Sequence, residues 1–461
     1  MRGSFFSSRL FQLAFATCIV LGAGRGAAAE WVLTYAVTDE VTIASPDEAT
    51  PPRRETRSFT QTVTLGEDTV AVQDDRRTMI YRISTRRVLN VSGEHNTYQD
   101  WSLFSLVDGR EAELFNRNAL GAAMRAAKID EAASQFRRFD SETELHMESQ
   151  PHPSNETAPV MEPVKRGDRL EFRYDGQIVA QFVPTETRLP PALHQRFVNY
   201  LAYSCAIHPE IRRAIAATGT VPQELIFTSR SVNRQTTSTR HLISSAPSHS
   251  DRSLLPAGAT LAGAGGDSVL QLVATVHEVA RSGQLPTRDA AIAFARARVA
   301  EKNALDALMA LIEYGLQSGD NLTAEIRRHR AIFEADDRCQ RYLKAFNQSS
   351  KALCEQNLAL SDSIDRTGLR KSHQLDLQRA NHLDRLGKPK EALEAYLNVV
   401  RANPAHAGAL HDLGMLLART YEHPKAWACW DAARRLYPAH PLFKDVIARE
   451  QRLLTGHPDF F

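Results

Sequence analysis

The end of the chain contains one 34-residue pattern twice. Residues 373–406 read HQLDLQRANHLDRLGKPKEALEAYLNVVRANPAH, and residues 407–440 read AGALHDLGMLLARTYEHPKAWACWDAARRLYPAH. A shift of 34 residues relates five positions of similar type: Ala380 and Gly414, Leu383 and Leu417, Ala392 and Ala426, Tyr396 and Trp430, Pro404 and Pro438. A fixed period of this length is typical of a repeat architecture, in which each unit buries its apolar face against the next.

The order of side chains, small, large apolar, small, aromatic and then proline, resembles the tetratricopeptide repeat. The resemblance covers about residues 373–440 and implies two stacked helical hairpins. Small side chains would let paired helices approach closely, and each proline would end the second helix of its unit. Apolar residues after Pro438 predict a cap helix over 441–456, so repeats and cap together occupy 366–461.

A tetratricopeptide resemblance implies that the repeats bind a protein or peptide through the first helix of each unit. That face would present seven candidate partner-binding residues: Leu377, Asn381, Asp384, Arg385, His411, Met415 and Arg419. The family's clamp for a terminal carboxylate combines an asparagine with two basic residues, and Asn381 and Arg385 match part of it. Leu377, His411 and Met415 depart from it, which puts the clamp itself in doubt.

Helical periodicity begins well before the repeat. From Val269 onward apolar residues recur with a period of 3.6, and further helices are expected over 286–312, 323–346 and 350–365. Two repeats rarely bury a core alone, because a stack needs about three. We therefore expect region 269–365 to extend the stack as degenerate repeats, although it contains no 34-residue match.

The preceding region, residues 30–245, shows a period of two instead. Alternation over 31–37 is typical of a strand with one buried face. The runs 170–174 and 178–182 alternate on either side of Asp175-Gly176, a pair that favours a tight hairpin turn. With helices expected over 112–129 and 191–203, the region predicts an antiparallel β-rich domain with one or two covering helices. The whole chain is therefore expected to be α+β, with an all-α helical-hairpin solenoid after the sheet.

Meandering strands under a covering helix resemble, in architecture only, the half-barrels of periplasmic lipoprotein carriers. That resemblance implies an apolar cavity for a lipid between sheet and helix; the alternative is a filled core without a ligand. Ser, Thr, Gly and Ala dominate residues 246–268, which predicts a linker between the two regions.

The first 29 residues have the layout of a secretory signal peptide. Arg2 and Arg9 begin it, residues 10–22 are apolar, and alanines up to Ala29 offer a signal-peptidase site. We therefore expect a periplasmic or secreted bacterial protein that begins near Glu30. No later segment approaches the roughly 18 apolar residues of a membrane span.

Export would place the cysteines in an oxidising compartment. Cys339 and Cys354 lie on two predicted helices joined by a short turn, at heights that differ by about one turn or less. Closely crossing helices can supply the Cα separation of a bridge, so we expect a disulfide between Cys339 and Cys354. Cys205 and Cys429 fall in different domains and are expected to be free.

The sequence carries no recognisable motif for catalysis, metal binding or a cofactor. It has no Gly-x-Ser-x-Gly elbow, and the string that begins at His277-Glu278 has Arg281 where a zinc protease needs its second histidine. A formal charge of +2 over 461 residues argues against nucleic-acid coating. The leading hypothesis is an exported, non-enzymatic protein that binds proteins through its repeats. The runner-up is a carrier or sensor of an apolar ligand or lipid, and an enzyme ranks third.

Overall fold

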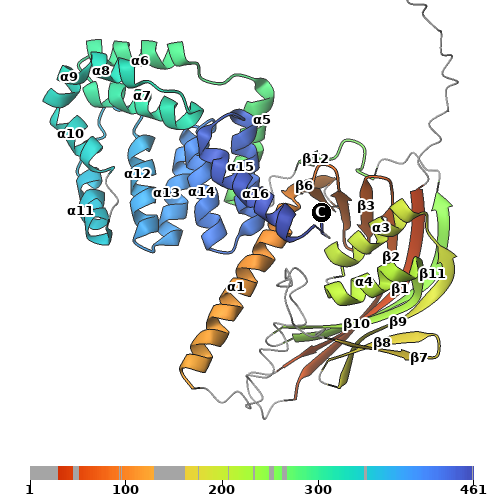
Figure 1. Ribbon diagram of the computed structural model, residues 1–461. Coiled ribbons are helices and arrows are strands. Elements are labelled where there is room, and N and C mark those ends of the chain that lie inside the picture. Colours follow the sequence, from red (N-terminus) through yellow and green to blue (C-terminus); the bar gives the residue numbers. More distant parts are fainter. Residues whose placement is uncertain are drawn as a thin grey trace, which may run out of the picture.

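The computed structural model places a curved sheet beside a stack of helices (Figure 1). It describes residues 30–44, 51–92, 94, 96–128, 161–174, 176–205, 207–231, 234–248, 254–261, 267–346, 350–458 and 460–461. The predicted signal peptide over 1–29 lies outside the described residues, as does Asp175 of the hairpin turn. The predicted α+β fold, with the β-rich region first and the helical region after it, is confirmed.

The described strands form one twelve-stranded sheet. In chain order they are β1 (Glu30–Ile43), β2 (Arg53–Leu65), β3 (Thr69–Gln73), β4 (Thr78–Arg82), β5 (Arg87–Ser92), β6 (Thr97–Ser102), β7 (Glu162–Arg166), β8 (Arg169–Tyr174), β9 (Gln177–Arg188), β10 (Thr220–Ser231), β11 (Arg234–Ser248) and β12 (Thr260–Leu261). Across the sheet the order is β12-β6-β5-β4-β3-β2-β1-β11-β10-β9-β8-β7. Neighbours pair antiparallel except β12 and β6, which pair parallel.

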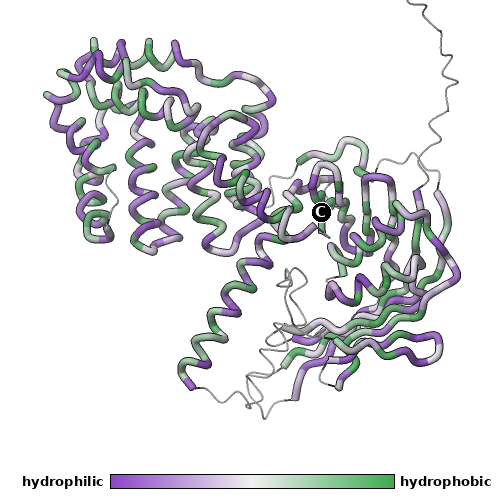
Figure 2. The backbone as a smooth tube through the Cα atoms, viewed as in Figure 1, coloured by the Kyte–Doolittle hydropathy of each residue, from purple (hydrophilic) through white to green (hydrophobic). Residues whose placement is uncertain are grey.

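Alternating side chains give the sheet one apolar face, which curves around helices α3 (Pro191–Tyr203) and α4 (Pro209–Thr218). Hydrophobic and hydrophilic positions alternate along the strands in Figure 2, and Leu33 and Tyr35 of β1 are buried as predicted. The predicted hairpin is formed by β8 and β9, with Gly176 at a φ of +73° in the turn. A register shift after Phe172 breaks the expected alternation, so Ile178 is 44% exposed.

The segment predicted as a linker contributes to the sheet instead. Strand β11 continues to Ser248, and its last residues pair with β1. Further along, β12 pairs with β6, while Leu254 and Leu255 pack against a small apolar cluster that includes Ile80 and Leu89. The unpaired backbone groups at the edge of a sheet can be satisfied by any extended segment, which explains why this stretch returns to it.

Helix α1 (Phe104–Ala126) begins directly after β6, about two turns earlier than predicted. Its first turn is buried, with Phe104 and Val107 in the main core. Further along, Phe115 is 74% exposed, and Figure 1 shows this part of the helix projecting away from the sheet. Helix α1 therefore enters the core through its first turn, while further along Glu111 pairs with Arg452 and Asn116 donates to the Tyr421 hydroxyl.

The helical region ends in two hairpins with the predicted spacing. Its helices are α5 (Ser268–Ser282), α6 (Arg288–Ala300), α7 (Ala304–Ser318), α8 (Thr323–Arg328), α9 (Arg330–Ala335), α10 (Asp337–Lys344), α11 (Lys351–Asp362), α12 (His373–Arg385), α13 (Pro389–Ala402), α14 (Ala407–Arg419), α15 (His423–Leu436), the 3-10 helix η1 (Pro441–Phe443) and α16 (Lys444–Gly456). Helices α12 and α14 start 34 residues apart, and so do α13 and α15. Whether these units are tetratricopeptide repeats in the family sense stays a prediction.

Close contact between α14 and α15 explains the small residue in the second repeat. A Cβ atom added to Gly414 would collide with the indole ring of Trp430. Trp430 is fully buried, packs edge-on against Trp427 and donates a hydrogen bond from Nε1 to the carbonyl oxygen of His411 at 3.2 Å. The size of one side chain thus fixes how closely the two helices approach.

The expected disulfide between Cys339 and Cys354 is not formed, because the predicted long helix over 323–346 is broken. Three short helices, α8 to α10, replace it, with breaks at His329 and Asp336. The comparison of heights along one straight helix therefore does not apply. None of the four described cysteines forms a disulfide, and all four are buried. Burial raises the pKa of the Cys339 thiol to about 12.

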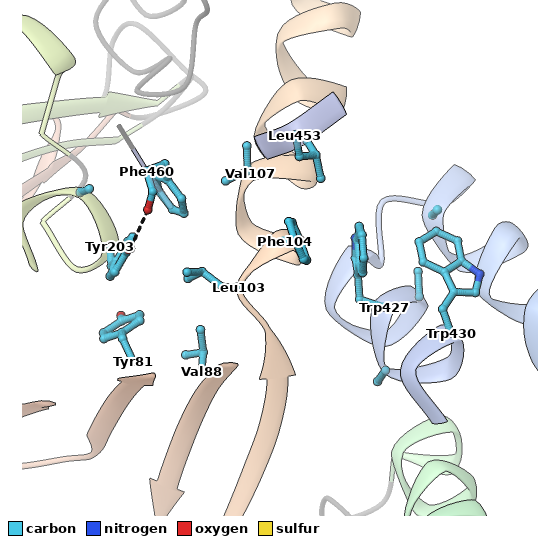
Figure 3. Packing of buried hydrophobic residues seen from close by; sticks show 14 of the residues in the cluster. Tyr81, Val88, Leu103, Phe104, Val107, Tyr203, Trp427, Trp430, Leu453 and Phe460 are labelled. Carbon is cyan, nitrogen blue, oxygen red and sulfur yellow. Dashed lines mark hydrogen bonds between the residues drawn. The ribbon is translucent and has the colours of Figure 1, made fainter. Parts of the chain in front are cut away.

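One continuous core joins the sheet region to the last repeat. Figure 3 shows Phe104, at the start of α1, between the strands and α15; its ring stacks on Trp427 with centroids 5.2 Å apart. At the end of the chain Phe461 packs on Phe104, with centroids 4.9 Å apart. Phe460 packs edge-on against Tyr203 of α3, whose hydroxyl donates to the Phe460 carbonyl at 2.6 Å.

A buried carboxylate completes this junction. Asp108 of α1 is 1% exposed, and its Oδ2 accepts hydrogen bonds from His423 Nδ1 at 2.7 Å and Trp427 Nε1 at 3.0 Å. Its Oδ1 accepts from Arg449 Nε of α16 at 2.6 Å. Burial alone would raise the pKa of Asp108, but the bonds from His423 and Arg449 outweigh it and lower the pKa. We call these four side chains the Asp108 clamp.

Replacing Trp430 with alanine should lower the free energy of unfolding by about 3–5 kcal/mol, the usual cost of emptying a packed aromatic site. Urea unfolding followed by circular dichroism measures it. The control is Ile447→Ala, since Ile447 is 40% exposed on α16; it should cost about 1 kcal/mol or less. Equal effects of both substitutions would contradict the observed burial of Trp430.

Asp108→Asn should destabilise the protein by about 3–5 kcal/mol, because it leaves the buried Arg449 contact without its carboxylate. The amide would also direct donor hydrogens at groups that are themselves donors. Glu113→Gln on the same helix, at a carboxylate 56% exposed, is the matched control and should change stability by about 0.5 kcal/mol at most. Chemical denaturation curves that coincide for both variants would refute the clamp.

Candidate functional site

Five of the seven predicted partner-binding residues meet in one pocket. This pocket, the repeat groove, has a volume of about 540 Å³ and lies between α12, α13 and α14. Its lining residues are Asn381, Asp384, Arg385, Tyr396, Asp412, Met415 and Arg419. The first helix of each hairpin therefore presents its side chains to a shared depression, as the sequence indicated.

The remaining two predicted residues are buried elsewhere. Leu377 is 5% exposed and belongs to the main core. His411 lies between Asp412 and Asp445 of α16, with its Nδ1 3.0 Å from Asp412 Oδ1 and its Nε2 3.2 Å from Asp445 Oδ2. Burial lowers the pKa of His411, but the two carboxylates outweigh that effect and raise it. Neither residue is among those that line the groove.

Tyr396 is a groove residue that is not among the seven predicted partner-binding residues. Its ring is buried, and its hydroxyl donates a hydrogen bond to Oδ1 of Asn381. This bond fixes the orientation of the amide, and it leaves the Asn381 NH2 group as a donor for a ligand. The aromatic position of the repeat pattern was the signal, because a tyrosine carries a polar group to the edge of the helix pair.

Charges in the groove are balanced. Arg419 pairs with Asp384 across the two first helices, and Asp412 contacts His411. Arg385 is exposed, and among the residues that the structure describes no carboxylate lies within ion-pair distance of it. The groove thus offers hydrogen-bond donors, acceptors and the apolar side chain of Met415 close together. This combination suits an extended peptide, whose backbone carries alternating N–H and C=O groups.

A second pocket, of about 320 Å³, lies between α6, α7 and α13 over the buried carboxylate of Glu313. Glu313 accepts hydrogen bonds from His373 at 2.5 Å and Asn403 at 2.6 Å, and Lys371 Nζ lies 2.6 Å from its Oε2. Burial would raise the pKa of Glu313, yet His373 and Lys371 lower it to about 2. Lys371, His373 and Asn403 all lie in or beside the repeats, so their contacts with Glu313 join α7 to the repeats.

The interior of the sheet region contains a buried guanidinium. Arg240 of β11 donates to Gln61 Oε1 at 2.5 Å and to the hydroxyl of Tyr200 on α3. Among the described residues, its Nε, the Tyr35 hydroxyl and the Ser238 hydroxyl have no hydrogen-bond partner. Unsatisfied buried polar groups are uncommon and call for an explanation. The rest of this core is filled by large apolar side chains such as Phe197.

Within the described ranges, no cluster of His, Cys, Asp and Glu could hold a metal ion. In the same part of the chain, no helix combines the length and apolar character needed to cross a bilayer.

No protein family and no curated protein matches the chain. Among solved structures it is similar to a lipovitellin chain described as "lipid-protein interactions in lipovitellin", with 11% sequence identity and a TM-score of 0.18. The similarity covers 94% of this chain and 56% of that one, so the protein spans little more than half the length of lipovitellin. A score this low assigns no common fold.

Stability should depend on pH through His406, the buried N-cap of α14. Its Nδ1 accepts from the Ala409 N–H at 3.1 Å, and burial lowers its pKa to about 4, against the opposing effect of Glu313. A histidine in the unfolded chain has a pKa of about 6.5. Between pH values of about 4 and about 6.5 the unfolded state binds more protons than the folded state. Each unit by which the pH falls in this range therefore lowers the free energy of unfolding by roughly 1 kcal/mol.

His406→Asn keeps a side-chain acceptor at the cap and removes the titrating group. Its free energy of unfolding should therefore fall less steeply than that of the wild type as the pH drops from about 6.5 to about 4.5. Denaturant titrations at several pH values give both slopes. If the slopes are the same, His406 is not held neutral in the folded protein.

Proposed function

We propose that this is an exported, non-enzymatic protein whose C-terminal helical repeats bind a peptide segment of another protein in the repeat groove. The observation that carries the proposal is the convergence of Asn381, Asp384, Arg385, Met415 and Arg419 on one pocket. The free amide donor of Asn381 and the exposed Arg385 supply hydrogen bonds to a peptide carbonyl and to an acidic group.

The 34-residue spacing of the two hairpins supports a tetratricopeptide-like role. The contact of Gly414 with Trp430 supports it too, because it gives a physical reason for the small residue of the pattern. Export rests on the basic start, the apolar stretch and the alanine site at the N-terminus.

The second candidate function is a carrier or sensor of a lipid in the sheet region. The unpaired groups around Arg240 favour it, because a ligand with a carboxylate or phosphate would satisfy a buried guanidinium. Native mass spectrometry of the purified chain distinguishes the two functions, since a carrier retains a bound lipid whereas a peptide-binding scaffold does not.

Peptides selected from a phage-displayed random library on the immobilised full chain should bind through the groove. Fluorescence anisotropy with a selected peptide should give about tenfold weaker binding for Asn381→Ala and for Arg385→Glu, the loss expected for one hydrogen bond to a charged or polar group.

Lys390→Glu is the matched control for this experiment, because Lys390 is exposed on α13 and does not line the groove. It should bind like the wild type. Failure to select any peptide, or equal binding by Asn381→Ala and Lys390→Glu, would reject the groove as the binding site.

A further inference from the structure

A third pocket lies where the sheet meets the last repeat. We call it the joint pocket; its volume is about 550 Å³. It is formed by the turn between β4 and β5, the start of α1, the end of α15 and helix α16, and it is lined by Thr85, Arg86, Arg87, Ser102, Phe104, Asp431, Arg434, Arg435, Pro438, Glu450 and Leu454. This volume is in the range of small-molecule sites.

Four arginines line the joint pocket, and two of them are occupied by carboxylates. Arg87 Nε donates to Asp100 at 2.7 Å, and Arg87 also pairs with Asp431. Arg434 pairs with Glu450 at 2.5 Å. These pairs tie β5 to α15 and α15 to α16. Of the two remaining guanidinium groups, Arg86 has no carboxylate partner among the described residues, and Arg435 has only Asp100, at 3.8 Å.

Arg86 is the first of these two. Its guanidinium lies 5.9 Å from the centre of the Phe104 ring, and its Nε is buried without a hydrogen-bond partner. Within the described ranges no carboxylate forms an ion pair with it. Its φ of +53° is a conformation that glycine adopts more easily. The backbone of the turn therefore does not require a large side chain at position 86. An arginine nevertheless occupies this position and lines the joint pocket.

Arg435 is the second. Its nearest carboxylate oxygen, on Asp100, is 3.8 Å away, and its NH1 contacts Nδ1 of His277 at 3.2 Å. Burial, together with Arg435 and Arg87, lowers the pKa of His277 to about 4, although Asp100 opposes the shift. His277 is therefore a neutral acceptor at physiological pH, and the charge of Arg435 is not compensated by it.

We propose that the joint pocket binds a small molecule that carries phosphate or carboxylate groups, held between Arg86 and Arg435. Guanidinium groups form strong, directed hydrogen bonds with both kinds of oxyanion. Phe104, Pro438 and Leu454 provide an apolar wall for the rest of the ligand. Because Arg86 belongs to the sheet region and Arg435 to the helices, the bound anion bridges the two. This site is separate from the repeat groove and does not depend on peptide binding.

Thermal unfolding and titration calorimetry of the full chain test the proposal with two probes, inorganic pyrophosphate and citrate. Each is compared with sodium chloride at the same ionic strength, since non-specific screening affects all three alike. We expect a saturable rise in melting temperature with at least one probe. A response to pyrophosphate alone indicates a phosphorylated ligand, and a response to citrate alone indicates a polycarboxylate.

Variants locate the site without endangering the fold. Arg86→Gly suits the positive φ of the turn, so the variant should fold at least as well as the wild type while binding the probe at least tenfold more weakly. Arg435→Gln should weaken binding similarly. Arg82→Gln is the control, because Arg82 is exposed at the end of β4 in the same hairpin. No response beyond sodium chloride, or wild-type affinity in Arg86→Gly and Arg435→Gln, would overturn the proposal.

Discussion

The carboxylate of Asp108 joins the two halves of this protein. An ionised carboxylate that is removed from water is stable only when donors satisfy its oxygens. Here the donors come from α15 and α16, whereas the acceptor comes from α1, which leaves the sheet edge directly. The helices therefore do not form a separate module. A fragment of residues 366–461 would lose the acceptor for His423, Trp427 and Arg449 and the aromatic contact with Phe104.

The same junction covers the end of the helix stack. A solenoid exposes apolar side chains on its terminal units, and these units need a covering layer. On the last hairpin that layer is provided by the beginning of α1, by α16 and by the final residues Phe460 and Phe461. Tyr203 holds the carbonyl of Phe460 from the sheet side. The end of the chain is thus part of the core that connects both regions.

Local patterns predicted much of the fold and of the groove. The 34-residue period placed four helices and five groove residues, because hairpin spacing and the exposed face of a helix depend on neighbours a few residues away. The Asp108 clamp joins residues more than 300 positions apart, and no periodicity marks an acid for burial. The break at Asp336, which removed the basis for the disulfide, has a local cause, because the Asp336 side chain caps α10 by accepting from the N–H groups of Arg338 and Cys339. Local sequence also could not show that β11 continues to Ser248 and pairs there with β1.

Contacts from the repeat groove and from the Asp108 clamp both reach α16. Asp412 lines the groove and contacts His411, whose other ring nitrogen reaches Asp445 near the start of α16. One turn further along the same helix, Arg449 donates to Asp108. One set of polar contacts therefore leads from the groove to the start of α16, and a second leads from the next turn of α16 to the sheet region. Contiguity alone transmits nothing, because coupling requires an element with two arrangements that both sites bias. Helices α15 and α16 are the candidates for such an element, because each contacts both His411 and Asp108.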